Sequence, residues 1–416
     1  MRPAPKTYRL HIGIFGRRNA GKSSILNALA GQSVSIVSEV AGTTTDPVEK
    51  PMELLPLGPV QFIDTAGIDD TGALGEERIE RTRQATERTD LAVIVVGDGH
   101  WTPFEQQLSD GFRQRQVPLV VVFNKSDLGD PSTEARQTLE SAKQDFVNVS
   151  ALKGTGIGAL RQALLQTAPQ DFVNRPGILT DLVPPGECAV LVVPIDKEAP
   201  KGRLIMPQVQ SIRDLLDNDS FCLVTKEREL RRTLDRLKVP PALVVTDSQA
   251  FLKVAADTPA SIPLTSFSIL FARFQGDLTE MVRGAMAIDT LKPGDSVLIA
   301  EACTHHPIGE DIGTVKIPRW LTQYVGGALK VEHTRGHDFP EDLSPYRLVI
   351  HCGACMWNRR EMLSRLLQCR QAGVPLTNYG LTIAYSLGIF ERALGPFPAA
   401  LDVYRNTAHK PGARHP

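Results

Sequence analysis

The sequence has few of the features that mark secreted, membrane-bound or nucleic-acid-coating proteins. Six cysteines in 416 residues are too few for a disulfide scaffold. Acidic and basic residues nearly cancel, giving a formal net charge of −1, and no five consecutive residues carry the same charge. Bulk electrostatic attraction to nucleic acid or to an anionic membrane is therefore not expected.

Long apolar runs are absent as well. No stretch approaches the ~18 apolar residues of a membrane span. The beginning of the sequence lacks the apolar core and small-residue cleavage site of a signal peptide. We therefore expect a cytoplasmic protein without a membrane partner, and in a reducing compartment paired cysteines are more often metal ligands or redox groups.

Short apolar strands alternate with helical stretches along most of the chain, a pattern that favours parallel sheets covered by helices. At roughly 150 residues per domain, the length suggests two to four domains. The alternation breaks at a Pro/Gly-rich segment, residues 181–188, and again near 259–268. We predict an α/β protein of three consecutive units with mostly parallel sheets, at residues 1–175, 185–262 and 263–416.

One helix is predicted with a specific buried side. Residues 358–373 read as a helix that ends at Gly373, with four apolar side chains on one face. These are Met362, Leu363, Leu366 and Leu367.

A phosphate-binding loop is predicted near the start of the chain. The segment from Gly16 to Ser23 fits G-x4-G-K-S between a predicted strand and a predicted helix. Backbone N–H groups of such a loop wrap phosphates, while Lys22 would reach the β- and γ-phosphates and Ser23 would bind magnesium. The nucleotide-binding residues predicted here are Gly16, Asn19, Ala20, Gly21, Lys22, Ser23 and Ser24.

Further motifs of a nucleotide site follow in order. "FIDTAG" places Asp64 at a strand end, suited to hold magnesium through water, and lets Gly67 offer its N–H to a γ-phosphate. In "FNKSDL", the Asp127 carboxylate can accept two hydrogen bonds from guanine, which adenine cannot supply. The other base-site residues predicted are Asn124, Lys125, Ser150 and Ala151. Together these motifs resemble the translation-factor-like GTPases, so the expected ligand is GTP.

"NAGKSS" and "AGTTTD" resemble one subgroup, the potassium-dependent GTPases such as the tRNA-modification GTPases. By that resemblance Asn19 would bind potassium and Thr44, beside Thr43, would be the second magnesium ligand. The implied catalytic set is Lys22, Ser23, Thr44, Asp64 and Gly67.

Two positions depart from related patterns. Thr45 stands where arginine is common, and Ile68 stands where Ras-type proteins carry a glutamine that orients the attacking water. Potassium, a switch backbone group, or a glutamate (Glu76 or Glu77) must orient the water instead, and the residues leave these alternatives open.

Cysteines and histidines gather in two short segments of the last unit. The first reads Cys303-x-His305 and the second, after 45 intervening residues, reads His351-Cys352-x-x-Cys355. Both follow predicted strands, and ligand sites gather beyond the carboxyl ends of parallel strands, so the halves are expected to meet. Three thiolates with imidazoles suit either tetrahedral zinc or a 4Fe-4S cluster, and the chemistry does not separate the two.

The remaining cysteines and histidines carry weaker expectations. His333 and His337, between the two cysteine segments, either support the site from behind or belong to a loop. Single cysteines in apolar surroundings are predicted to be core thiols. These are Cys188, Cys222 and Cys369.

The cysteine segments behind a potassium-type GTPase domain resemble the FeFe-hydrogenase maturation GTPases, the HydF family, and the resemblance covers nearly the whole chain. It is carried by "ILFARFQGDL", "EACTHHP", "IGTVKIPRWL", "GHDFPEDL", "HCGACMWNRREM" and "VPLTNYG". It implies a GTPase domain (1–175), a dimerisation domain (185–262) and a cluster-binding domain (263–416).

The resemblance also implies cofactors and partners. A 4Fe-4S cluster would be held by Cys303, Cys352 and Cys355, with His305 or His351 as candidate fourth ligand. A homodimer would accept a two-iron precursor from two radical-SAM maturases and deliver it to apo FeFe-hydrogenase. The alternative interpretation is a tRNA-modification or ribosome-associated GTPase whose cysteines hold structural zinc, against which the balanced charge argues.

Overall fold

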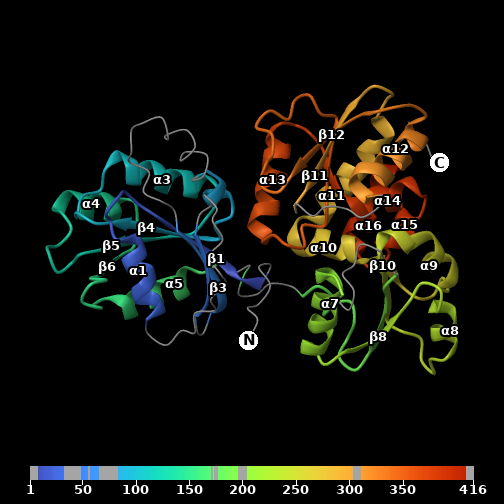
Figure 1. Ribbon diagram of the computed structural model, residues 1–416, viewed down its shortest axis with the longest axis horizontal. Coiled ribbons are helices and arrows are strands. Elements are labelled where there is room, and N and C mark those ends of the chain that lie inside the picture. Colours follow the sequence, from blue (N-terminus) through green and yellow to red (C-terminus); the bar gives the residue numbers. More distant parts are fainter. Residues whose placement is uncertain are drawn as a thin grey trace. The chain divides into compact units, whose positions relative to one another are not determined.

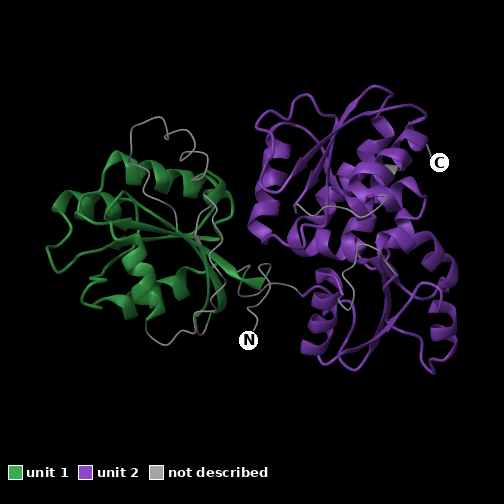
Figure 2. Ribbon diagram, in the orientation of Figure 1, with its two compact units in different colours: residues 1–175 green, residues 176–416 purple. Residues whose placement is uncertain are grey.

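The computed structural model divides the chain into two compact units, residues 1–175 and 176–416 (Figure 2). It describes residues 8–31, 48–54, 57–64, 83–169, 172, 177–194, 204–302 and 311–408. Within these residues, no helix is both long enough and apolar enough to cross a membrane. The predicted boundaries at residues 185, 262 and 263 stay predictions.

Unit 1 is built on a six-stranded sheet in the order β2-β3-β1-β4-β5-β6 (Figure 1). All neighbouring strands are parallel except β2 and β3. Its strands are β1 (Leu10–Phe15), β2 (Val48–Leu54), β3 (Gly58–Asp64), β4 (Leu91–Val96), β5 (Leu119–Phe123) and β6 (Phe146–Asn148). Its helices are α1 (Lys22–Ala30), α3 (Pro103–Gln114), α4 (Thr133–Ser141) and α5 (Ile157–Thr167).

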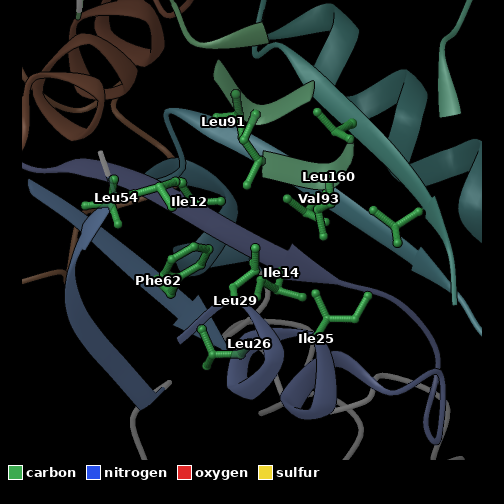
Figure 3. Packing of buried hydrophobic residues seen from close by; sticks show 14 of the residues in the cluster. Ile12, Ile14, Ile25, Leu26, Leu29, Leu54, Phe62, Leu91, Val93 and Leu160 are labelled. Atoms are coloured by element: carbon green, nitrogen blue, oxygen red, sulfur yellow. The ribbon is translucent and has the colours of Figure 1, made fainter. Parts of the chain in front are cut away.

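Both faces of this sheet are buried, which explains the continuous apolar runs of its central strands. Alternate residues of β4 belong to two different cores: Val93 and Val95 pack with α1 and α5, whereas Ile94 packs with α3 and α4. Figure 3 shows the first core, where Ile12 and Ile14 of β1 meet Leu26 and Leu29 of α1. The rigid sheet fixes the loops at its carboxyl edge.

Unit 2 contains two four-stranded parallel sheets. The first has the order β10-β9-β7-β8, with β7 (Cys188–Val192), β8 (Phe221–Thr225), β9 (Leu243–Thr246) and β10 (Leu264–Ser266). Its helices are α7 (Met206–Asp217), α8 (Leu230–Asp235), α9 (Phe251–Asp257) and α10 (Phe267–Gln275).

The second sheet has the order β12-β11-β13-β14, with β11 (Ser296–Glu301), β12 (Lys330–Arg335), β13 (Leu348–His351) and β14 (Leu376–Asn378). Its main helices are α11 (Leu278–Met286), α12 (Ile317–Val325), α13 (Arg359–Gln371), α14 (Tyr379–Ser386), α15 (Phe390–Leu394) and α16 (Pro398–Ala408). Helix α10 follows the first sheet and contacts α13 and α14 of the second, which joins the two within one unit. The prediction of three α/β sheets, mostly parallel, is confirmed.

Two edge strands had no apolar signal in the sequence. β2 reads VEKPMEL and β12 reads KVEHTR, and most of the β12 side chains are half-buried or exposed. An edge strand needs no apolar face on its open side, so its hydrogen bonds to β3 or β11 suffice to place it. His333 accordingly lies in β12 and not in a loop, whereas His337 lies in the turn after it.

The predicted buried side of the 358–373 helix needs correction. In α13, Met362 and Leu366 are buried as expected, but Leu363 is half-buried and Leu367 is 38% exposed. The chain buries a charged side chain, Arg365, next to Leu366 instead. The helix is therefore turned so that Arg365 faces the interior together with Met362 and Leu366, while Leu367 faces outward.

Candidate nucleotide and cysteine sites

The phosphate-binding loop lies between β1 and α1, as the sequence predicts. Gly16 has φ 144°, and a Cβ on it would come within 2.3 Å of the Val95 carbonyl oxygen. Gly21 has φ 91° at the N-cap of α1, where a Cβ would lie 2.2 Å from the Asn124 amide nitrogen. Both positions therefore require glycine, and the loop can press its N–H groups toward a phosphate.

Lys22 and Ser23, the residues predicted to contact phosphate and magnesium, are both held by hydrogen bonds. The Lys22 ammonium donates to the carbonyl oxygens of Gly16 (2.7 Å) and Arg17 (2.9 Å), which holds it over the loop. The Ser23 hydroxyl donates to the Asp64 carboxylate at 2.9 Å, so the two predicted magnesium-site residues are together. This is the arrangement that a Mg²⁺–phosphate complex needs.

The base-binding loops are tied to the phosphate loop by Asn124. Its amide nitrogen donates to the Ala20 carbonyl (2.9 Å), and its amide oxygen accepts from the Ala151 N–H (3.1 Å). The Ser150 hydroxyl donates to the Asp127 carboxylate at 2.5 Å. That hydrogen bond lowers the pKa of Asp127, which therefore stays ionised at neutral pH and can accept from guanine.

A further ion pair fixes the phosphate loop from outside, and the sequence analysis did not find it. Arg17 donates through Nε to the Glu105 carboxylate (2.8 Å) and through a terminal nitrogen to Asp98 (2.7 Å). Glu105 is fully buried in the first turn of α3, whose N-cap residue is Thr102. A loop arginine paired with a buried carboxylate is a tertiary contact without a local motif.

The switch residues of the prediction lie outside the described residues. They are Thr43, Thr44, Thr45, Gly67, Ile68, Glu76 and Glu77. The roles given to them stay predictions.

Cys352 and Cys355 lie beyond the carboxyl end of β13, and both are half-buried. The Cys352 sulfur accepts a hydrogen bond from the Ala302 N–H at 3.0 Å. Ala302 directly precedes Cys303 in the sequence, so this contact brings the end of β11 to the Cys352 loop; that Cys303 itself meets this loop stays a prediction. Cys303, His305 and His306 themselves lie outside the described residues, and among the residues described no three His, Cys, Asp or Glu side chains form a metal-binding group.

Backbone groups contact the Cys352 sulfur. Burial raises the pKa of this thiol overall, and the N–H groups of Ala302 and Ala354 oppose that rise by stabilising the charged form. Ala354 has φ 49°, which turns the backbone of the C-x-x-C loop back toward Cys352. Such N–H···S contacts are typical of protein-bound thiolate centres.

His351 is held by two neighbours. Its Nε2 accepts from the Arg365 guanidinium at 3.0 Å, which requires the proton on Nδ1, and Nδ1–H donates to the Cys352 carbonyl at 2.9 Å. Burial, with Arg365 adding to it, lowers the pKa of His351 to about 3, so the ring is neutral. Both ring nitrogens are therefore engaged, and in this conformation His351 supports the loop without offering a nitrogen to a metal.

A second layer surrounds this loop. The Trp357 ring stacks on His337 at 5.6 Å between centroids and lies edge-on to His351 at 5.3 Å. His337 Nδ1 lies 2.5 Å from the Glu361 carboxylate.

A separate set of hydrogen bonds lies at the end of β11, where the Glu301 carboxylate accepts from Tyr379 (3.0 Å) and Arg335 (3.1 Å). The sequence analysis left open whether His337 supports the site or belongs to a loop, and the other residues were missed because no local pattern marks them.

The single cysteines differ in burial. Cys188 and Cys369 are buried, as expected of core thiols, whereas Cys222 of β8 is half-buried.

Curated relatives match the first third of the chain. The tRNA modification GTPase MnmE of Chromobacterium violaceum is 40% identical over 158 residues, which is 38% of this chain and 34% of the relative. MnmE of Aquifex aeolicus is 38% identical over 157 residues, or 37% of this chain and 34% of the relative. The chain thus spans about a third of the length of these relatives, and the likeness is to a GTPase domain.

Solved structures of GTPases give weaker likenesses. Era of Aquifex aeolicus is 19% identical, covering 60% of this chain and 99% of that one, with a TM-score of 0.32. The cytosolic domain of FeoB from L. pneumophila is 23% identical, covering 38% of this chain and 70% of that one, with a TM-score of 0.29. At these scores neither carries an argument.

Family models cover the chain in three parts. Residues 11–125 match the model described as "50S ribosome-binding GTPase". Residues 178–276 match the "Hydrogen maturase F dimerization domain", and residues 279–396 match the "Hydrogen maturase F tetramerization domain". The two hydrogen maturase F models together span more than half of the chain. With its GTPase domain in front of them, the chain is a GTPase that belongs to the hydrogen maturase F family.

Proposed function

We propose that this hydrogenase maturation GTPase is a scaffold that binds a 4Fe-4S cluster and carries a two-iron precursor to apo FeFe-hydrogenase. The precursor would come from two radical-SAM maturases. The observation that carries the proposal is the 3.0 Å contact between the Ala302 N–H and the Cys352 sulfur, because it joins the end of β11, directly before Cys303 in the sequence, to the Cys352 loop inside a hydrogen maturase F domain.

The donors fit an iron–sulfur cluster. Thiolates are the soft anionic ligands that hold cluster irons, and the Cys352 sulfur accepts a backbone N–H bond. Cys303, Cys352 and Cys355 would hold the cluster, which would supply the docking site for the two-iron cargo. Because both described cysteines are half-buried, a cargo or partner protein can approach them.

The cluster is tested against zinc by anaerobic purification. A protein with broad visible absorption, about four irons per chain and an EPR signal after reduction supports the proposal. A colourless protein with stoichiometric zinc would support the alternative of a structural zinc site. The tRNA modification for which the MnmE relatives are named belongs to proteins that match this chain only over the GTPase domain.

GTP turnover is assigned to regulate exchange of partners and not the iron chemistry, because a phosphoryl-transfer site has no group that builds metal ligands. Magnesium would be held by Ser23 and Thr44, and GTP by the loops around Lys22, Asn124 and Asp127.

Potassium is proposed as the cation that completes this site, with Asn19 as its ligand. Asn19 lies in the phosphate loop with φ 60°, a left-handed conformation that asparagine tolerates. A cation beside the phosphates stabilises charge that develops during hydrolysis, so we expect GTPase rates about tenfold or more higher in potassium than in sodium.

The positive φ of residue 19 decides which substitutions test the potassium site without straining the backbone. Asn19→Gly accepts a positive φ and removes the ligand, so the potassium advantage should disappear, whereas Asn19→Asp keeps an oxygen ligand and should retain part of it. Equal wild-type rates in both salts would refute the potassium site.

The dimer is proposed to form along β8. Among the described strands, β8 is an edge strand of its sheet. Its apolar side chains are exposed to solvent: Phe221 is 50% exposed and Val224 is 49% exposed. Exposed apolar side chains continue on the adjoining α7, at Val209 and Leu216. An open, apolar strand edge is a template for pairing with another chain, and it lies inside the family's dimerization domain.

Lysines at Phe221 and Val224 should break this contact. An unpaired buried charge at symmetry-related positions costs several kcal/mol, so the dimer dissociation constant should rise about 100-fold or more. Light scattering should then show the mass of the assembly halved. Leu128→Lys, at an 80% exposed leucine of unit 1, is the control and should leave the mass unchanged; an unchanged mass in the β8 variant would exclude this edge as the interface.

A further inference from the structure

A buried cation lies directly behind the cysteine loop. Helix α13 begins at Arg359, four residues after Cys355, and the Asn358 side chain caps it by accepting from the Glu361 N–H at 3.2 Å. Arg365, in the middle of this helix, is only 4% exposed. A guanidinium is always charged in proteins, so the interior beside the cysteine loop carries a fixed positive charge.

Aromatic rings and hydrogen bonds hold the Arg365 guanidinium in one orientation. Its central carbon lies 4.1 Å from the Trp357 ring centroid and 4.5 Å from the Phe339 ring centroid. One terminal nitrogen donates to His351 Nε2 at 3.0 Å, and the other donates to the Gly336 carbonyl at 2.8 Å. Ring faces attract cations most strongly where water is excluded.

The guanidinium is linked to a predicted cluster ligand through one side chain. It fixes the tautomer of His351, whose Nδ1–H then donates to the Cys352 carbonyl at 2.9 Å. The Cys352 N–H donates in turn to the Ala300 carbonyl of β11 at 2.9 Å. Arg365 thus sets both the backbone position of Cys352 and the charge that its sulfur faces.

The effect of this charge on a cluster has a definite sign. Adding one electron makes a thiolate-bound cluster more negative, and a nearby cation stabilises the more negative form, strongly so in a low-dielectric interior. A cation therefore raises the reduction potential, and its removal lowers the potential.

We infer that Arg365 is a positioning residue that holds the Cys352 loop through His351 and raises the reduction potential of the cluster. The inference rests on the proposed function, since it needs a cluster on Cys352. In the measured step, one electron passes from an external reductant such as dithionite to the cluster, and no bond is formed or broken.

The experiment compares three variants after reconstitution with iron and sulfide under anaerobic conditions. Arg365→Met removes the charge at similar length, and Arg365→Lys keeps the charge without the planar fork. Arg370→Met is the matched control, because Arg370 lies on the same helix, is 63% exposed and pairs with Glu280 on the surface. Iron per chain, an EPR-monitored redox titration and GTP hydrolysis are measured for each.

We expect a more negative midpoint potential in Arg365→Met, a midpoint close to wild type in Arg365→Lys and Arg370→Met, and the same GTPase rate throughout. If Arg365→Met loses the cluster while Arg365→Lys keeps it and GTP hydrolysis is intact, the result also supports the inference, because only the variant without the positive charge is affected. A full cluster with the wild-type midpoint in Arg365→Met would overturn the inference. So would loss of the cluster from both Arg365 variants, which would make Arg365 a packing residue only.

Failure of the proposed function gives a different result. In that case the wild-type protein itself binds no redox-active cluster, and Arg365→Met does not differ from it in iron content.

Discussion

Replacing Cys352 by alanine should remove the iron–sulfur EPR signal and abolish hydrogenase activation while GTP hydrolysis continues at the wild-type rate. In the proposed site three thiolates would anchor the cluster, and losing one would leave too few to hold it. The described contacts of the proposed nucleotide site join residues 16 to 151, all within unit 1, so we expect a change beyond β13 to leave GTP hydrolysis intact. Cys303→Ala and Cys355→Ala should behave in the same way.

Two sets of controls separate ligands from neighbours. Cys222→Ala removes a half-buried thiol from the other sheet of unit 2 and should keep the full cluster. His305→Ala and His351→Ala should keep part of the iron, since a fourth position can be filled by water or another small ligand. Iron quantitation, EPR, a GTPase assay and an in vitro maturation assay are the measurements. A Cys352→Ala protein with a full 4Fe-4S signal that still activates hydrogenase would rule out this ligand assignment.

The structure alters what a His351 variant means. His351 accepts from Arg365 and donates to the Cys352 carbonyl, so alanine there removes a support of the loop. A partial loss of iron in His351→Ala is therefore expected from displacement of Cys352 alone. The Arg365 variants distinguish the two explanations, because they disturb the same support and leave the imidazole in place.

The parts of the site that the sequence predicts are those written in short contiguous motifs. Gly16, Gly21 and Lys22 follow one another because a phosphate is wrapped by one loop at one helix end. The base loops are found for the same reason, and each follows a parallel strand whose carboxyl end lies at the same edge of the sheet as the phosphate loop.

The parts that the sequence does not predict depend on partners from different elements. Arg365 contacts groups from the end of β13, the turn after β12 and the segment before α13. In the sequence it is an arginine within a leucine-rich helix, which reads as a solvated side chain. Its burial follows only when Trp357 and Phe339 are known to surround it. The same holds for Arg17, whose partner Glu105 lies 88 residues away.

Edge strands show the opposite limitation. β8 reads FCLVT and its apolar composition predicts burial, yet its side chains are exposed or half-buried. The apolar composition of β8 predicts that its side chains pack against another apolar surface. It does not tell whether that surface belongs to the same chain or to a partner. The other edge strand, β12, shows the reverse. Its residues are mostly polar, as expected of an edge strand that is not covered by a partner.

Asp127→Asn should change the nucleotide that unit 1 selects. The carboxylate accepts from guanine N1–H and from the exocyclic N2 amine, and the Ser150 hydroxyl holds it ionised by lowering its pKa. An asparagine amide presents one acceptor and one donor, so its NH2 group opposes the guanine amine. A site built to hydrogen-bond a ligand group discriminates strongly against a mismatch, and we expect GTP affinity to fall at least about 100-fold.

Xanthine nucleotides should reverse this loss, because xanthine carries a carbonyl oxygen where guanine has the amine, and that oxygen accepts from the asparagine NH2. Binding and hydrolysis of GTP and XTP are measured side by side, with Asp130→Asn as the control, since Asp130 is 77% exposed and pairs with Arg136. The control should keep the wild-type preference for GTP. Iron content should be unchanged in both variants, because the cysteines lie in the other unit. An Asp127→Asn protein that still prefers GTP would disprove the role given to this carboxylate, and one that lost iron together with GTP would contradict the independence of the two sites.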